Sequence, residues 1–451
     1  MRSESKVQKV MPMIMLVFVL ALSMQEAFNI CAPIIAEDFK ITSSDVSFIS
    51  AVALLTMGVA NIVYTALSDF ISIKKLLVSG IIIQVTGSLA GIFFSNSVLA
   101  VIFFRAVQMA GGSCAFALLI LTATRYLNEN IRMKYYGYNG ACFSGGQMLG
   151  ILFGGIFATY LGWRYLFIVP AMSAVCIPFI MKYLPEDSKE EKRKIDFTGI
   201  FLMATLALFI SLYFNTMNSH IFMISLLVAG VFLFYISKNK NAFITIEFFK
   251  NWKYMLVILV VLITYLTQGS YSFLFSFMVS KVHGIEPSRI SMILLPSYAV
   301  SMVIGIFGSR ITQKIGITRT LVTALGSMAL GLVAGSIFLD KSIVVLILVS
   351  CLFNGGFAIL YTPIMALVIN SLPEKMRGTG LGFFNLSIKI ASSTGIVITG
   401  KLLTVEFLKN NGLIGSMSEA GVIYSNILLI FLIVVSVSFV TVNIIKKVLI
   451  K

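Results

Sequence analysis

Three ionisable residues lie deep inside long apolar runs of the sequence, where they could take part in chemistry. Glu26 is the only acidic residue well inside such a run, and Arg105 and Lys389 are the only basic ones. If the runs cross a membrane, each charge costs roughly 2.5–3.5 kcal/mol at mid-bilayer, so each is expected to face a partner or a wet cavity. A carboxyl group in such a place can carry a proton, and a cation can bind an anionic group.

The composition indicates that lipid is the solvent of this chain. Of its 451 residues, 58% are hydrophobic and only 12% are charged, about half the charged share of a soluble protein. The five cysteines fall in apolar runs without a CxxC spacing, and the two histidines fall in predicted outer loops. We therefore expect no metal, no cofactor, no disulfide and no histidine-based catalytic site.

The apolar runs predict an all-α membrane protein with fourteen spanning helices. A span needs about 20 residues, and the first run is too long for a cleaved signal peptide. The runs are 11–33, 46–67, 76–95, 98–124, 134–160, 163–184, 196–215, 219–237, 254–280, 290–309, 320–339, 342–371, 377–402 and 421–445.

Basic residues orient these spans. Most of the 34 Lys and Arg residues fall in alternate connecting segments, which places both termini in the cytoplasm. The net charge of +16 is then a topology signal that requires no nucleic-acid partner. The charged loop "PEDSKEEKRKID" divides the chain into a six-helix bundle (1–184), a linker with an inserted helix pair (185–253) and a second six-helix bundle (254–451).

Similar charged loops occur at the same place in each bundle. Asp69, Lys74 and Lys75 lie between the second and third spans, and Arg310 and Lys314 lie between the corresponding spans of the second bundle. This correspondence indicates an internal repeat at the level of topology.

Several stretches resemble the major facilitator superfamily. They are "TALSDFISIKKLL", "RAVQMAGGS", "GQMLGILFGG" and "GWRYLFIVP". Together with the late "GVIYSNILL", the first is most similar to the fourteen-helix tetracycline/proton antiporters of Gram-positive bacteria. The resemblance implies a multi-pass protein of the bacterial plasma membrane. It also implies that Asp69 and the loop cations bridge helix ends and gate transport. For Asp69 we favour this gating role, whereas for the lysines we favour a plain cytoplasmic anchor.

Two of the buried charges fall at similar depths in the first bundle. Glu26 and Arg105 each lie seven residues from the outer end of a predicted span, about 10 Å below the outer surface. Asn29 shares the face of Glu26, and Gln108 shares that of Arg105. We expect the two charges to pair, with Glu26 carrying a proton whose affinity Arg105 tunes; a static ion pair between two helices is the alternative.

Lys389 lies near mid-membrane in the thirteenth span. It is expected to contact an anionic group of the substrate or to alternate with the proton, unless it reaches a backbone carbonyl or snorkels. The other polar residues expected to line the substrate cavity are Gln25, Asn29, Gln108, Gln147, Gln268, Asn354 and Asn385.

Glycines in the fifth span predict close helix packing. Gly146, Gly150 and Gly154 recur at four-residue spacing, followed by Gly155. This spacing lets a neighbouring helix approach backbone to backbone.

The sequence departs from the tetracycline antiporters at four membrane and loop acids. Aligned motifs place Gln25, Gln147, Ser392 and Gln313 where those proteins carry carboxylates. We expect a monomeric secondary transporter, not an enzyme, that exports an amphipathic drug-like compound, of tetracycline or multidrug type, in exchange for protons, with lipids as its surroundings. The alternatives are a transporter of an endogenous anionic or neutral metabolite, lipid or peptide and, more remotely, a membrane transferase or a non-transporting receptor.

Overall fold

The computed structural model describes residues 2–68, 71–186, 196–239, 242, 249–373, 377–412 and 418–449. Throughout these ranges the chain is helical, without strands, and fourteen helices are long and apolar enough to cross a membrane. The prediction of fourteen spans is thereby confirmed. An even number of spans returns both termini to one side, which the distribution of basic residues identifies as the cytoplasmic, or inner, side.

The first bundle comprises the spans from the N-terminus to residue 183. Its helices are α1 (Arg2–Phe39), α2 (Ser43–Leu67), α3 (Ile73–Phe94), α4 (Val98–Tyr126) and α5 (Glu129–Ile156). A π-helical turn, Phe157–Leu161, ends α5. The sixth span is broken into 3₁₀ turns at Trp163–Phe167 and Met172–Val175, α6 (Ile168–Ala171) and α7 (Cys176–Tyr183). Pro170 and Pro178 lie in this span, where each removes a backbone donor.

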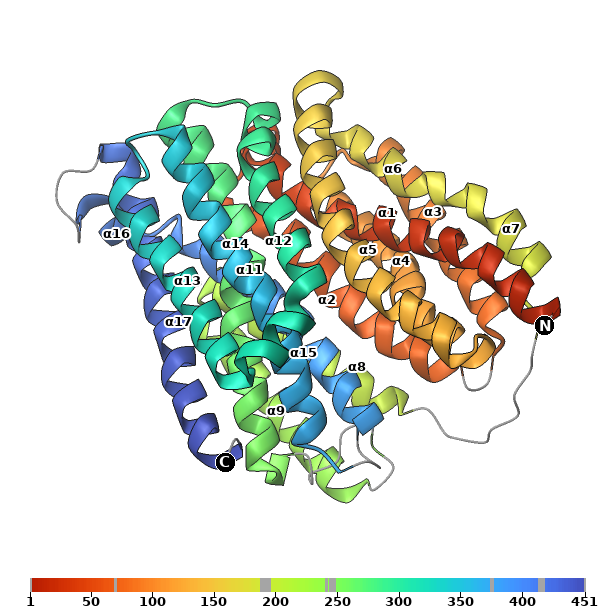
Figure 1. The fold of residues 1–451 in the computed structure, drawn as a ribbon. Helices are drawn as coiled ribbons and strands as arrows, with labels where there is room; N and C mark the ends of the chain where they lie inside the picture. The colour runs from red at the N-terminus through yellow and green to blue at the C-terminus, as the bar shows by residue number, and fades with distance from the viewer. Residues whose placement is uncertain are drawn as a thin grey trace.

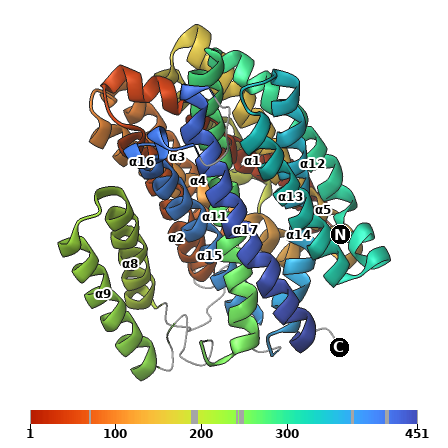
Figure 2. The same ribbon diagram turned by 90° about the vertical axis from the view of Figure 1, so that its left-hand side faces the viewer.

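The inserted pair stands beside the junction of the two bundles. Its members are α8 (Phe197–Thr216) and α9 (Ser219–Lys238). Helix α8 packs against α2 and α15, whereas α9 packs mainly against α8 and is largely exposed (Figure 2). A helix that is apolar all round and exposed in this way is suited to a lipid environment.

The second bundle repeats the six-span pattern (Figure 1). Its helices are α11 (Trp252–His283), α12 (Pro287–Ile315), α13 (Ile317–Phe338), α14 (Ile343–Asn370), α15 (Arg377–Leu402) and α17 (Val422–Leu449), with a short α16 (Glu406–Asn410) before the last. Polar N-caps begin several of these helices: the Asn251 side chain accepts from the backbone N–H of Tyr254, and that of Ser342 from Val344.

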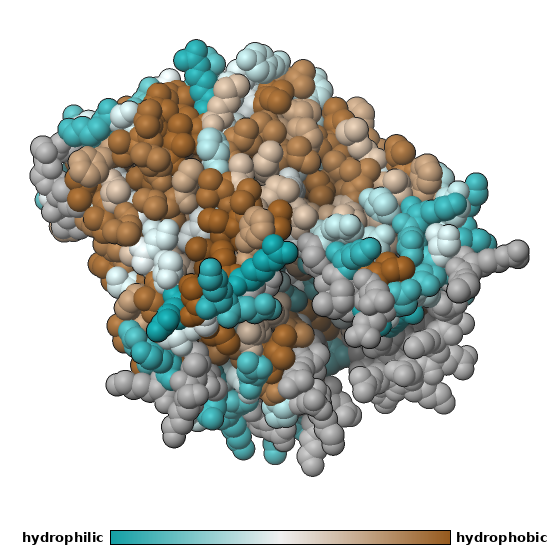
Figure 3. All heavy atoms as spheres, viewed as in Figure 1, coloured by the Kyte–Doolittle hydropathy of each residue, from teal (hydrophilic) through white to brown (hydrophobic). Residues whose placement is uncertain are grey.

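Apolar side chains cover much of the outside of the molecule. Brown, hydrophobic atoms form a broad surface in Figure 3, and hydrophilic residues gather along its lower margin. Large residues such as Phe93 and Leu99 are more than 70% exposed. A soluble protein rarely exposes so extensive an apolar surface, which here would contact the lipid chains.

Candidate functional site

The two bundles contact each other mainly through three helix pairs, α1 with α11, α2 with α15, and α5 with α12. Hydrogen bonds cross the junction at each pair. Ser276 donates to the carbonyl of Asn29 at 2.9 Å, Ser393 to that of Ala51 at 2.8 Å, and Ser291 to that of Ile151 at 2.7 Å. All three bonds lie in the outer parts of these helices, so the described hydrogen bonds between the bundles hold their outer ends together.

Three glycines farther inward on α5 and α12 make no such close contact. A Cβ added at Gly155, in the outer part of α5, would lie 2.2 Å from the Ser291 Oγ of α12. A Cβ added at Gly140 or Gly145 of α5, or at Gly305 of α12, would meet no atom within 4 Å. Figure 1 shows the two helices separating from their outer ends. The hydrogen bonds and close glycine contacts described between the bundles therefore lie toward the outer side of the junction.

Glu26 lies at this junction on α1. It is only 3% exposed, and the Gln147 side-chain amide of α5 donates to its Oε1 atom at 3.4 Å. Its Oε2 atom has no hydrogen-bond partner within the described chain. One turn outward, the Asn29 amide donates to the Ser272 hydroxyl of α11 at 3.1 Å. The carboxyl group thus faces the second bundle, and Tyr298 of α12 is close enough to interact with it electrostatically.

The expected ion pair between Glu26 and Arg105 is absent from the described residues. Arg105 is fully buried on the other side of α1, where it donates to the Met24 carbonyl at 3.2 Å and to the Gln108 side chain. Its guanidinium lies 4.0 Å from the centroid of the Phe28 ring. The prediction of pairing was wrong because equal depth in the membrane does not fix the direction in which a side chain points. Glu26 projects from α1 toward Gln147 of α5, whereas Arg105 reaches α1 from α4, at Met24 and Phe28.

Lys389 extends from α15 into the first bundle. Its Nζ atom lies 5.4 Å from the centroid of the Phe116 ring of α4 and 5.8 Å from that of the Phe143 ring of α5. Its stem passes close to α2, where a Cβ added at Gly58 would lie 2.7 Å from the Lys389 Cβ. The side chain is 6% exposed.

Glu26 and Lys389, the two buried charges at the junction, contact neighbouring positions of α5. Phe143, beside Lys389, and Gln147, beside Glu26, are four residues apart on α5. They share a face and differ in height by about 6 Å. Glu26 and Lys389 interact electrostatically, but no ion pair joins them among the described residues. The arrangement offers a ligand a carboxyl group and an ammonium group that do not neutralise each other by direct contact.

The remaining polar residues expected in the cavity are divided between the two bundles. Gln25 of α1 and Gln268 of α11 are buried on junction helices, and Asn385 is half-buried on α15. Two others are engaged inside a bundle: the Asn354 amide donates to Ser297 at 3.0 Å, and that of Gln108 to Ser88 at 3.0 Å. These two amides stabilise contacts within their own bundles.

The glycines of α5 contact α1 and α12. Added Cβ atoms at Gly146, Gly150 and Gly154 would lie 3.2 Å or less from atoms of Leu22, Ser23 and Ala27 of α1, respectively. Gly155 faces Ser291 instead. Gly146, Gly150 and Gly154 thus allow α1 to lie directly against α5, and this packing brings Glu26 close to Gln147. Gly155 allows α5 to approach α12 of the second bundle.

Sequence reasoning missed the aromatic and hydroxyl residues at the junction, namely Phe116, Phe143, Ser272 and Tyr298. The spacing of the repeat contains a signal for one of them: Ser272 follows Asn29 by 243 residues, so the two occupy equivalent positions in their bundles. The aromatic residues carry no such signal, because Phe is abundant throughout the chain.

The first charged loop is tied to its surroundings, although Asp69 lies outside the described residues. Lys75 pairs with Glu186 of the linker at 2.9 Å and, by this hydrogen bond, holds the pKa of Glu186 below its ordinary value. Arg125, at the end of α4, donates to the Ser68 carbonyl at 2.7 Å. Lys74 is half-buried at the start of α3.

The second charged loop has different contacts. Arg310 lies 5.7 Å from the centroid of the Phe307 ring, and Lys314 is exposed. The cation–π contact is local, between residues of one helix. The two loops therefore share their place in the topology but differ in their described contacts.

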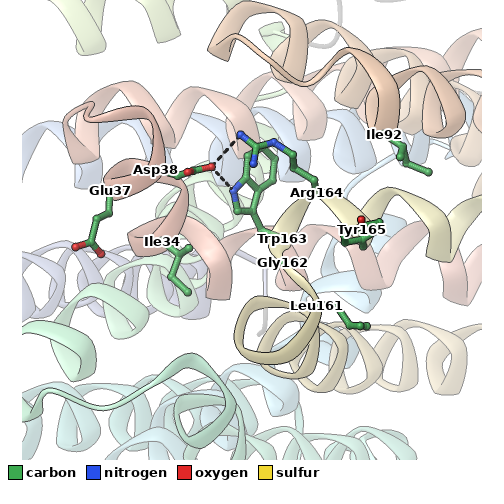
Figure 4. Close-up of a pocket in the computed structure, with 9 residues that line it drawn as sticks. All are labelled: Ile34, Glu37, Asp38, Ile92, Leu161, Gly162, Trp163, Arg164 and Tyr165. Carbon is green, nitrogen blue, oxygen red and sulfur yellow. Dashed lines mark hydrogen bonds and ion pairs between the residues drawn. The ribbon is translucent and has the colours of Figure 1, made fainter.

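A separate cavity lies at the outer end of α1, and neither Glu26 nor Lys389 lines it (Figure 4). It has a volume of about 550 Å³ and is bordered by Glu37, Asp38 and the turn Leu161–Tyr165. Both the Trp163 indole and the Arg164 guanidinium donate to Asp38 Oδ2 at 3.0 Å. Gly162 has a φ of +94° that allows this turn. These contacts fix the outer end of α1 to the connection between α5 and the sixth span.

Comparisons with known proteins agree with this architecture. The family model described as the Major Facilitator Superfamily matches residues 14–396. The riboflavin transporter RibZ of Clostridioides difficile is 24% identical over 375 residues, covering 81% of this chain and 82% of that protein. The quinolone resistance protein NorB of Staphylococcus aureus is 24% identical over 414 residues, covering 85% of this chain and 86% of that protein.

Solved transporter structures share the fold. The nucleoside transporter NupG superposes with a TM-score of 0.69 at 13% identity, over 98% of this chain and 99% of that one. The POT family transporter PepTSo gives a TM-score of 0.70 at 13% identity, over 96% of this chain and 98% of that one. A D-xylose–proton symporter gives 0.65 at 14% identity, over 94% and 97%.

Proposed function

The chain belongs to the major facilitator superfamily, a family of transporters, and from this membership we propose that it exports an amphipathic compound in exchange for protons. The observation that carries the proposal is the position of Glu26. It is the one acidic residue deep in a span, and it lies at the junction that must open and close during transport. A carboxyl group that faces each side of the membrane in turn can move a proton across it.

The proposed mechanism uses the contacts around this group. In the conformation seen here, hydrogen bonds such as those from Ser291 and Ser393 hold the outer ends together. A substrate entering from the cytoplasm would meet Lys389 and, about one turn farther out, Glu26. Rocking of the bundles would break the outer bonds and open the cavity outward. A proton from outside would then displace the substrate from Glu26 and return with the carrier.

The substrate class is argued from the site and the relatives together. Aromatic rings border the junction, among them Phe116 and Phe143 beside Lys389. Rings of this kind favour planar, amphipathic compounds. The names of RibZ and NorB refer to riboflavin and to quinolones, respectively, and both are fused-ring compounds. The four missing acids make tetracycline chelates, which are cationic, a poorer match than a multidrug range.

A second candidate function is favoured by Lys389. A lysine at the cavity suits an anionic or neutral metabolite as the cargo, as the name of RibZ illustrates for riboflavin. In this case the chain would serve a metabolite of the cell, and proton exchange would still use Glu26. A panel that contains both riboflavin and a quinolone separates the two candidates.

The test is transport by the purified chain in proteoliposomes with an imposed pH gradient. Riboflavin, norfloxacin, tetracycline and ethidium serve as substrates, and a dye in the lumen reports proton movement. We expect Glu26→Gln to abolish substrate-driven proton movement and uphill transport. Glu37→Gln, at the exposed outer end of the same helix, is the matched control and should behave like the unaltered chain. Proton movement unchanged in Glu26→Gln would refute the proposed coupling.

A further inference from the structure

Two phenylalanines, Phe116 and Phe143, form a site that is occupied by the side chain of Lys389. The ammonium group lies within 6 Å of the centroids of both the Phe116 and Phe143 rings. Cation–π attraction acts over this distance and is stronger in a desolvated place. Pairs of aromatic rings around a cation are the arrangement by which proteins recognise organic cations. Here the cation is covalently attached to the opposite bundle.

Residues of the surrounding helices fix the position of the Lys389 side chain. Gly58 of α2 leaves room for the Lys389 stem, since an added Cβ there would lie 2.7 Å from the Lys389 Cβ and 3.2 Å from its Cγ. Phe116 is supported from behind by Phe18, at 5.1 Å between ring centroids. A larger residue at position 58 would push the side chain away from the rings. The backbone and the rings therefore hold the ammonium group in one place.

The ammonium group is held without a counterion in direct contact. Within the described residues, Glu26 is the acidic residue that interacts with it electrostatically, and no ion pair joins the two. The rings are only partly buried, so they border the junction rather than a closed core. A ligand that reaches the junction can approach the same rings or the ammonium group itself.

We propose that the Phe116–Phe143 pair is a binding site for organic cations, and that Lys389 occupies it as a tethered ligand in the conformation seen here. While the lysine stays in place, the site excludes permanently charged cations and offers a positive charge to anionic or zwitterionic aromatic compounds. Lys389 is thus a specificity-determining residue. The inference deepens the proposed function by naming the charge class of the substrate, and it relies on that function only in placing the site on the transport path.

The test uses two probes of nearly the same shape and opposite charge, tetraphenylphosphonium and tetraphenylborate. Their binding to the purified full chain in detergent is measured by calorimetry at one pH, without vesicles or a gradient. We expect Lys389→Met to bind the phosphonium at least about tenfold more tightly and the borate about tenfold more weakly, the scale of a desolvated cation–π contact. Lys401→Met, at the outer end of the same helix, is the matched control and should alter neither.

A second set of variants tests the rings. Adding Phe116→Leu and Phe143→Leu to Lys389→Met keeps the apolar volume but removes both rings, so the gain in phosphonium affinity should disappear. Phe143→Leu alone keeps the lysine and tests the site even if Lys389→Met does not fold. With one ring gone, the ammonium group is freer, and the borate should bind several-fold more tightly while the phosphonium does not.

The outcomes separate this inference from the proposed function. Equal changes for the two probes in Lys389→Met, or a gain that persists without the rings, would overturn the tethered-cation site. Proton coupling does not enter the binding measurement. A charge reversal at equilibrium together with no proton movement in vesicles would therefore support the site and refute the proposed antiport.

Discussion

The two bundles repeat the same close backbone contacts but carry different chemistry on them. A Cβ added at Gly111 of α4 would lie 2.5 Å from the Gly80 carbonyl of α3. A Cβ added at Gly356 of α14 would lie 2.7 Å from the Ala324 carbonyl of α13. The equivalent residues are separated by about the 243 residues that also relate Asn29 to Ser272. The repeat is therefore one of backbone packing.

The side chains beside these contacts differ. In the first bundle, the Arg105 guanidinium lies over Phe28 and binds Gln108. In the second bundle, the equivalent positions hold an aromatic stack, in which Tyr271 lies 4.1 Å from Phe353, centroid to centroid, and shares a hydrogen bond with Ser350 at 3.0 Å.

This difference assigns distinct tasks to the two bundles. The charge inside the first bundle supports α1 next to Glu26, whereas the second bundle is uncharged at the same place and contributes Lys389 to the junction. A buried charge has a desolvation cost that an aromatic stack avoids. In the first bundle, the desolvation cost of Arg105 arises next to α1, the helix that carries Glu26.

The largest expected effect is a loss of transport when Arg105 is replaced. The comparison is with Ser350, at the equivalent position of the second bundle. Arg105→Met removes the donor that holds the Met24 carbonyl, and should lower transport on the order of a hundredfold while leaving the protein folded. Ser350→Ala should cost about 1 kcal/mol of stability and leave transport within a few-fold. Transport assays and thermal unfolding in detergent measure both. Equal losses of transport would remove the functional distinction between the bundles.

The shared packing should respond alike in the two bundles. A Cβ at Gly150 would lie 2.1 Å from the Ser23 carbonyl, and one at Gly395 would lie 2.1 Å from the Leu266 carbonyl. Each Gly→Ala substitution forces two helices apart, so each should lower the free energy of unfolding by about 1–3 kcal/mol.

Gly145→Ala is the matched control for this pair, because no atom lies within 4 Å of the added Cβ. It should be neutral or stabilising by about 0.5–1 kcal/mol through its helix propensity. Unfolding in detergent gives all three values. If Gly150→Ala lowered the free energy of unfolding and Gly395→Ala did not, the two bundles would share the arrangement of their helices but not the close backbone packing.

The smallest expected effect concerns the charged loops. Lys75 lowers the pKa of Glu186, so the pair stabilises the folded state above the ordinary carboxyl pKa and loses this contribution as the pH falls through the lowered pKa. Glu186→Gln should therefore lower the unfolding temperature slightly at pH near 7, and the difference should vanish in acid. Because both partners are more than half exposed, added salt should weaken the effect. Lys314→Gln, in the second loop, is the control and should show no such dependence on pH.

The span count was predictable because each span carries its own signal. Fourteen runs such as 98–124 are long enough to cross the bilayer alone, and the structure places helices on them, for example Val98–Tyr126. The glycines of α5 were also visible, since four-residue spacing places them on one face. Which helix meets that face was not visible, because spacing along one helix does not identify its neighbour.

The sequence by itself determined the spans, their orientation, the repeat and the three buried charges. These are local properties, set by hydropathy, by basic residues in short loops and by the rarity of charge in lipid. The tertiary structure alone decided how the charges are grouped. Arg105 contacts Met24 and Gln108 within its bundle, whereas Lys389 reaches from α15 to Phe116 and Phe143. The rotation of each helix and the closure of the outer ends result from packing between residues far apart in the chain, which no local pattern specifies.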